Sequence, residues 1–98
     1  MAIRDDAKLL ILTSLAGGPK HGYAMIEDIA SITGVRLGPG TLYGAISRLE
    51  AGGMIEALQS DDRRRPYQIT ARGRRHLEAE FGGMKGLVTT GLRRLKKA

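Results

Sequence analysis

Apolar residues recur along this chain at helical spacings, in stretches separated by glycine- and proline-containing breaks. The first predicted helix begins after Asp5 or Asp6, either of which can cap it, and runs to about Ala16. Its apolar residues spread around more of the helix than a single stripe; they are Leu9, Leu10, Ile11, Leu12 and Leu15. Because so small a domain has little with which to cover such a helix, we expect a partner chain to cover part of it.

Two further helices are predicted in quick succession. The second extends from about Gly22 to Ile32, and Gly34 is suited to end it. The third begins at Pro39, a residue that fits a first helical turn, and runs to about Gly52. Its buried stripe has the i, i+4, i+7 spacing of one helix face and consists of Leu42, Ile46 and Leu49.

A hairpin and a last helix complete the predicted order. One strand spans Met54 to Gln59, and a second lies around residues 67–70. Thr70 can cap a fourth helix, whose apolar residues follow alternating spacings of four and three, with Gly91 at one position of the pattern; they are Leu77, Phe81, Met84, Val88 and Leu95. The pattern therefore predicts a mainly α protein with a small β-hairpin, in the order of a winged helix-turn-helix with an additional C-terminal helix.

The composition fits one small folded domain. The chain has 98 residues, of which 42% are hydrophobic and 27% charged. The absence of cysteine excludes disulfides, thiolate catalysis and cysteine-based metal sites. The longest apolar run, residues 9–12, is far shorter than the roughly 20 residues of a membrane span, so we expect no membrane association and a cytoplasmic location.

Positive charge is concentrated in two stretches. Residues 1–80 carry eleven lysines or arginines against ten acids, whereas residues 81–98 carry five basic residues and no acid. Residues 63–75 hold six arginines and no carboxylate. An arginine-dense stretch within a folded domain is typical of a phosphate-binding edge, while a basic tail can simply be a solvated helix end.

Four segments resemble, in order and spacing, the PadR family of bacterial transcriptional regulators. They lie within about Leu9 to Leu77 and read Gly18-Pro19-Lys20-His21-Gly22-Tyr23, Leu37-Gly38-Pro39-Gly40-Thr41-Leu42-Tyr43, Arg48-Leu49-Glu50 ahead of Gly53-Met54-Ile55-Glu56, and Arg64-Arg65-Pro66-Tyr67-Gln68-Ile69-Thr70-Ala71-Arg72-Gly73. The resemblance implies a homodimeric repressor whose third helix enters the major groove and whose terminal helices form the dimer interface. It also implies that a small-molecule effector is possible, although no stacking pocket is evident in this chain.

Candidate base contacts lie on the third helix. Thr41 and Tyr43 are off its buried stripe, and Gly40 in the first turn allows a close approach to phosphate or base edges. Ser47, one turn later, can also reach a base edge. Arg48 contacts a phosphate or forms an ion pair within the chain.

The wing and the start of the second helix supply further candidates. We expect phosphate contacts from the basic hairpin tip, which contains Arg63, Arg64 and Arg65. Tyr23 either packs toward the helix-turn-helix core or offers its hydroxyl group to a phosphate. Because His21 and Tyr23 share no plausible site with a second histidine, a carboxylate pair or a nucleophile, we expect no enzymatic activity, no cofactor and no metal.

The sequence thus predicts a winged helix-turn-helix DNA-binding domain over residues 1–70 and a C-terminal dimerisation helix with a basic tail over residues 71–98. We expect a homodimeric, sequence-specific transcriptional regulator, a repressor, that binds a palindromic operator in double-stranded DNA. The alternative is a winged-helix protein-interaction module that binds an acidic partner. The residues expected at the dimer interface are Leu9, Leu12, Leu77, Phe81, Met84 and Val88.

Overall fold

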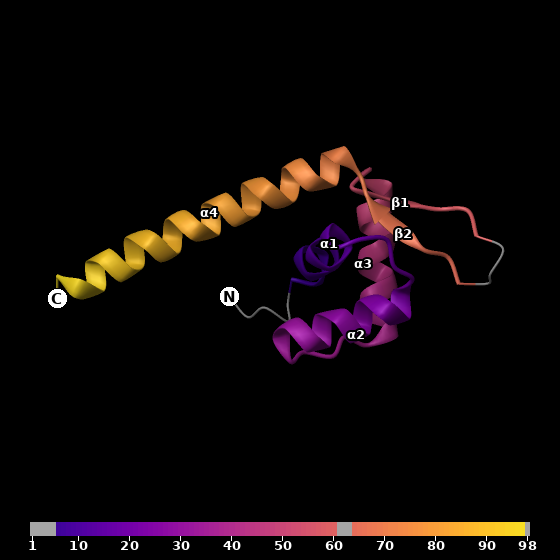
Figure 1. Ribbon diagram of the computed structural model, residues 1–98, viewed down its shortest axis with the longest axis horizontal. Helices are drawn as coiled ribbons and strands as arrows, with labels where there is room; N and C mark the ends of the chain where they lie inside the picture. Colours follow the sequence, from indigo (N-terminus) through magenta and orange to yellow (C-terminus); the bar gives the residue numbers. More distant parts are fainter. Residues whose placement is uncertain (1–5, 61–63, 98) are drawn as a thin grey trace.

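The protein is described here by a computed structural model that covers residues 6–60 and 64–97. The elements within these residues are α1 (Ala7–Ala16), α2 (Gly22–Thr33), α3 (Pro39–Ala51), β1 (Ile55–Ala57), β2 (Tyr67–Ile69) and α4 (Ala71–Lys96). This order confirms the predicted mainly α fold with a small hairpin. Figure 1 shows α1, α2 and α3 clustered together, with the hairpin projecting to one side and α4 extending to the other.

These helices begin and end at residues that the sequence predicts to cap them. The Asp6 carboxylate accepts a hydrogen bond from the Leu9 N–H at 3.0 Å, and the Thr70 hydroxyl oxygen accepts one from the Gly73 N–H at 3.1 Å. Gly34 ends α2 with a φ of 76°, in the left-handed region that favours glycine. The local sequence therefore determines where these helices begin and end.

The hairpin strands are shorter than predicted. β1 pairs with β2 antiparallel, with Ile55 opposite Ile69 and Ala57 opposite Tyr67. One more hydrogen bond runs from the Leu58 N–H to the Pro66 carbonyl. Pro66 has no backbone N–H with which to return a bond, so the ladder stops there.

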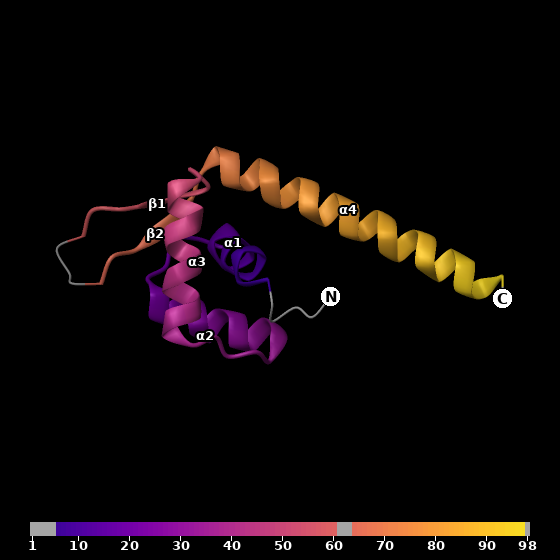
Figure 2. The same ribbon diagram turned by 180° about the vertical axis from the view of Figure 1, so that it is seen from behind.

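Helix α1 forms the centre of the core. It contacts α2, α3, β2 and α4, and Figure 2 shows it enclosed between α2, α3 and the first part of α4. Ile11, Leu12 and Leu15 are each exposed by no more than 1%. The expectation that a partner chain is needed to cover this helix is therefore wrong, because the other elements of the same chain cover it.

Helix α4 begins in the core and continues beyond it. Gly73 and Leu77 are buried, and Leu77 belongs to the core cluster of the single chain. Phe81 is 43% exposed, and the apolar residues of α4 with still larger exposure are Leu87, Val88, Leu92 and Leu95. Leu77, like Leu12, is thus not part of an exposed surface, whereas the apolar face of α4 is uncovered from Phe81 onward. None of the helices in the described residues is long and apolar enough to cross a bilayer.

The connector between α1 and α2 is tied to the wing. The Lys20 N–H donates to the Tyr67 carbonyl at 3.1 Å, and the Tyr67 N–H donates to the Lys20 carbonyl at 2.9 Å. The Lys20 ammonium group donates to the Ser14 carbonyl at 2.6 Å and lies 3.9 Å from the Asp28 carboxylate. Asp28 in turn accepts a hydrogen bond from the buried Ser14 hydroxyl at 2.7 Å. These bonds hold the base of the wing against the start of α2.

Candidate nucleic-acid interface

Helix α3 has one buried and one exposed side, as its sequence pattern predicts. Its buried residues are Leu42, Ala45, Ile46 and Leu49. Thr41, Tyr43 and Ser47 are exposed, and Tyr43 has an exposed fraction of 50%. Gly40 is also exposed, and a Cβ placed there would have no neighbour within 4 Å. The first turns of α3 therefore present small polar groups and one phenol to solvent.

A groove of about 550 Å³ joins α2, α3 and the wing. Its lining residues are His21, Gly22, Tyr23, Tyr43, Arg64, Arg65 and Tyr67. All three tyrosines of the chain lie in this set, together with two arginines. Among the described residues, no carboxylate lines the groove. Cationic guanidinium groups and phenol hydroxyls are donors that suit a polyanion such as a nucleic-acid backbone.

A glycine positions one of these tyrosines. Gly22 is buried, and a Cβ placed on it would clash with the hydroxyl group of Tyr43. The missing side chain allows the Tyr43 phenol to lie against the first turn of α2. The sequence predicts that the second helix begins at about Gly22, but it does not indicate this contact, which joins α2 to α3.

Tyr23 and the wing arginines lie where a ligand can reach them. Tyr23 is 62% exposed, so the alternative in which it packs into the helix-turn-helix core is wrong. Arg64 and Arg65 are both exposed on the wing. Arg63, which was predicted with them, lies outside the described residues.

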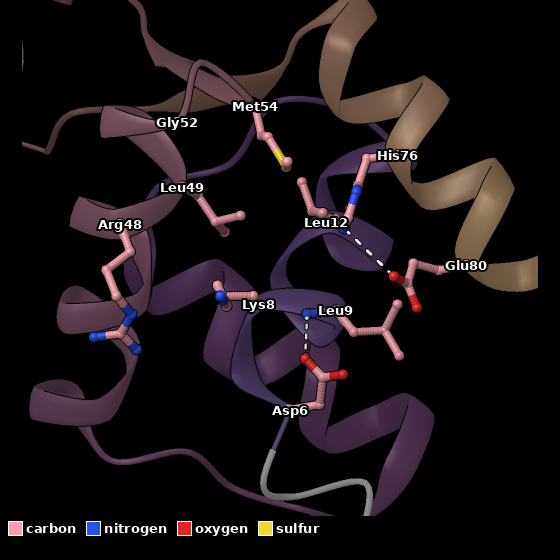
Figure 3. Close-up of a pocket in the computed structure, with 10 residues that line it drawn as sticks. All are labelled: Asp6, Lys8, Leu9, Leu12, Arg48, Leu49, Gly52, Met54, His76 and Glu80. Carbon is pink, nitrogen blue, oxygen red and sulfur yellow. Dashed lines mark hydrogen bonds and ion pairs between the residues drawn. The ribbon is translucent and has the colours of Figure 1, made fainter.

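Arg48 lies apart from the groove. It lines a second cavity of about 330 Å³ between α1, the end of α3 and the start of α4, together with Leu9 and Leu12. Figure 3 shows the Arg48 side chain extending away from His76 and Glu80, whose ring nitrogen Nε2 and carboxylate are 3.7 Å apart. The structure therefore brings Tyr23 and Tyr43 together with Arg64 and Arg65, but not with Arg48. A phosphate contact by Arg48 stays a prediction.

The connector that leads into α3 is braced against α2. The Arg36 guanidinium group forms a hydrogen-bonded ion pair with the Glu27 carboxylate. This hydrogen bond holds the pKa of Glu27 below its ordinary value and raises the pKa of Arg36. Both side chains are exposed, so the pair orients the connector more than it stabilises the fold.

Comparison with known proteins identifies the family. The model of the transcriptional regulator PadR-like family matches residues 11–79, which is most of the chain. The chain belongs to this family. The chain is 39% identical over 88 residues to the transcriptional regulator Rv3488 of Mycobacterium tuberculosis. The match covers 87% of this chain and 81% of that protein.

A second relative is much longer. The PadR-like chain is 47% identical over 83 residues to an uncharacterized 37.1 kDa protein in transposon TN4556 of Streptomyces fradiae. The match covers 85% of this chain but 24% of the relative, so the chain spans about a quarter of that protein's length.

Solved structures show the same fold. A PadR family transcription regulator from Clostridium difficile R20291 matches with a TM-score of 0.82 and 22% identity, over 92% of this chain and 98% of that one. F93 from STIV, a winged-helix DNA-binding protein, matches with a TM-score of 0.77 and 19% identity, over 90% and 96% of the two chains. At this identity the likeness concerns the fold alone, and it confirms the predicted winged helix.

Proposed function

We propose that this PadR-like protein is a sequence-specific DNA-binding repressor that acts as a homodimer in the cytoplasm. The observation that carries the proposal is the groove in which three tyrosines and two arginines flank the exposed side of α3. In this proposal, residues 1–70 bind the DNA and residues 71–98 join the two chains. Membership of a family of transcriptional regulators supports it.

The exposed side of α3 is the part suited to read base edges. Thr41 and Ser47 are small hydrogen-bonding residues on the side opposite the core, and Tyr43 lies beside them. An α-helix fits the major groove of B-DNA, where each base pair presents a distinct set of donors and acceptors. With α3 in that groove, the wing lies over the adjacent backbone, where Arg64 and Arg65 meet phosphates.

The first test is selection of duplex fragments from the source genome by the purified protein. We expect the recovered fragments to share a palindrome, because the two identical DNA-binding domains of a dimer bind two inverted half-sites. Failure to bind any duplex DNA at low salt would contradict the proposal and favour the alternative, an acidic protein partner.

Replacing Arg65 by alanine is expected to weaken binding to operator and to random DNA alike. A phosphate contact carries no base information, and its loss lowers the slope of log K against log salt by about one unit per wing. Titration by fluorescence anisotropy at several salt concentrations measures both quantities. Lys85→Ala, at an exposed position of α4 away from the wing, is the control and leaves the slope unchanged. A new preferred sequence with an unaltered slope would count against this role.

Replacing Thr41 by alanine, or Tyr43 by phenylalanine, is expected to lower the discrimination between operator and random DNA. The loss is roughly 1–3 kcal/mol for each base contact removed. The thermal midpoint stays close to that of the wild type, because both side chains are exposed. A collapsed midpoint together with normal operator binding by the remaining folded protein would show that these residues are structural.

The uncovered face of α4 supports the homodimer. The face of α4 that Leu77 buries in the core continues beyond it, at spacings of three and four residues, through Phe81, Met84 and Val88. Leu95 lies one heptad beyond Val88. Exposed apolar residues at coiled-coil spacing are suited to a second copy of the same helix. We therefore place the dimer interface on this face, with Leu9 as a half-buried neighbour on α1.

The charges along α4 favour an antiparallel arrangement of the two copies. Glu78 and Glu80 stand at the start of the exposed face, while the residues at its end are basic: Arg93, Arg94, Lys96 and Lys97. Antiparallel helices bring Glu78 and Glu80 of one copy toward the basic end of the other, whereas parallel helices bring the two basic ends together.

A further inference from the structure

His21 is built into the groove by its role at the start of α2. Its Nδ1 atom accepts a hydrogen bond from the Ala24 N–H at 3.3 Å, which caps the helix. A ring nitrogen that accepts a hydrogen bond carries no proton, so the neutral imidazole has its proton on Nε2. Within the described residues, Nε2 makes no hydrogen bond, and His21 lines the same groove as Arg64 and Arg65.

The backbone around His21 is held in place. The preceding residue, Lys20, exchanges two backbone hydrogen bonds with Tyr67 of the wing, and its side chain is bonded to the Ser14 carbonyl. His21 is therefore fixed on both sides, by the wing through Lys20 and by α2 through Ala24. A donor that is already ordered before binding loses little conformational entropy when it meets its acceptor.

We propose that His21 is a further DNA-contacting residue, whose Nε2–H donates a hydrogen bond to a backbone phosphate. A phosphate oxygen is an acceptor, and the groove offers it a neutral donor in addition to the cationic side chains of Arg64 and Arg65. The acceptor is a phosphate rather than a base, because His21 precedes α2 and faces the wing, whereas the exposed residues that can read bases lie on α3. This inference rests on the proposed DNA binding.

Two substitutions distinguish the role of His21 as a helix cap from its proposed role as a hydrogen-bond donor to phosphate. Asparagine is among the best N-caps, but its amide is too short to place a donor where Nε2 lies. Glutamine can place its amide nitrogen near the Nε2 position, but it is a poor cap. His21→Asn therefore keeps the helix start and removes the phosphate donor, while His21→Gln does the reverse.

The expected results differ in both stability and affinity. His21→Asn keeps the thermal midpoint of the wild type but binds operator and random DNA roughly tenfold more weakly per half-site. The salt slope is unchanged, because a neutral donor displaces no counterion. His21→Gln has a lower midpoint but, at a temperature where it is folded, binds within a few-fold of the wild type. His76→Asn, on α4 and outside the groove, is the matched control and binds like the wild type.

Three outcomes would overturn the inference while leaving DNA binding intact. One is wild-type affinity in His21→Asn, which would reduce His21 to a cap. Another is a loss of affinity in His21→Gln as large as in His21→Asn. The third is a salt slope lowered by about one unit in His21→Asn, which would show a charged imidazolium instead of a neutral donor. A wild-type protein that binds no duplex DNA would overturn the proposed function itself.

Discussion

Substituting Phe81 and Met84 together by aspartate is expected to produce a monomer whose operator affinity is lower by a factor of about 10² to 10⁴. Phe81 is 43% exposed and Met84 is half-buried on the face of α4 that continues beyond the core. Two buried carboxylates in a dimer interface would be strongly unfavourable. A monomer binds a single half-site and lacks the high effective concentration that a dimer gains by linking two DNA-binding domains.

Sedimentation velocity at micromolar concentration and operator titration measure the two effects. The matched control is Gly82→Asp with Thr89→Asp, which adds the same charge at exposed positions outside the apolar spacing. The control remains dimeric and binds the operator. Truncation after Gly82 is expected to act like the Phe81 and Met84 substitutions. A wild-type monomer that binds a palindrome tightly and without cooperativity would contradict the homodimer.

Replacing Gly73 by alanine is expected to destabilise the fold by about 3 kcal/mol. Gly73 is buried in the first turn of α4, where a Cβ would clash with the Met54 carbonyl oxygen and lie 2.8 Å from Ile69 Cγ1. The Met54 carbonyl cannot simply move away, because it accepts the Thr70 N–H at 3.0 Å. The added methyl group therefore pushes the start of α4 away from the hairpin, and the thermal midpoint falls by roughly 10–25 °C.

Gly86→Ala is the control for this effect. A Cβ at Gly86 has no neighbour within 4 Å, and alanine favours a helix interior over glycine by roughly 1 kcal/mol. We expect Gly86→Ala to raise the midpoint slightly in the same calorimetric measurement. An equal midpoint for Gly73→Ala and the wild type would show that the hairpin and α4 can separate at little cost.

The sequence alone determines the helices of this protein, because the residue at which a helix begins or ends depends on its neighbours along the chain. The side chains of Asp6 and Thr70 cap α1 and α4, because each accepts a hydrogen bond from the backbone N–H three residues further along the chain. Gly34 ends α2, and Pro39 begins α3. The spacing of Leu42, Ile46 and Leu49 likewise predicts which side of α3 is buried, and hence which side can face DNA. Family membership is also readable from the sequence, since the four PadR-like segments lie in order.

The tertiary structure decides which apolar residues are covered and by what. Helical spacing makes Leu12 and Leu77 equivalent to Phe81 and Val88 as candidates for a dimer interface. Only the packing shows that α1 is enclosed by its own chain, and that α4 leaves the core between Leu77 and Phe81. A one-dimensional pattern records that a face is apolar, but it does not record whether that face meets the same chain.

The groove is likewise a product of contacts between distant segments. Lys20 pairs with Tyr67 across 47 positions of sequence, and the missing side chain of Gly22 makes room for Tyr43. These contacts bring His21, Arg64 and Arg65 to the lining of one groove and leave Arg48 at another cavity. No local propensity specifies such pairings, because they depend on how the helices and the hairpin pack. The sequence therefore determined the helices, the exposed side of α3 and the family, while the packing alone assembled the groove that we propose binds phosphates.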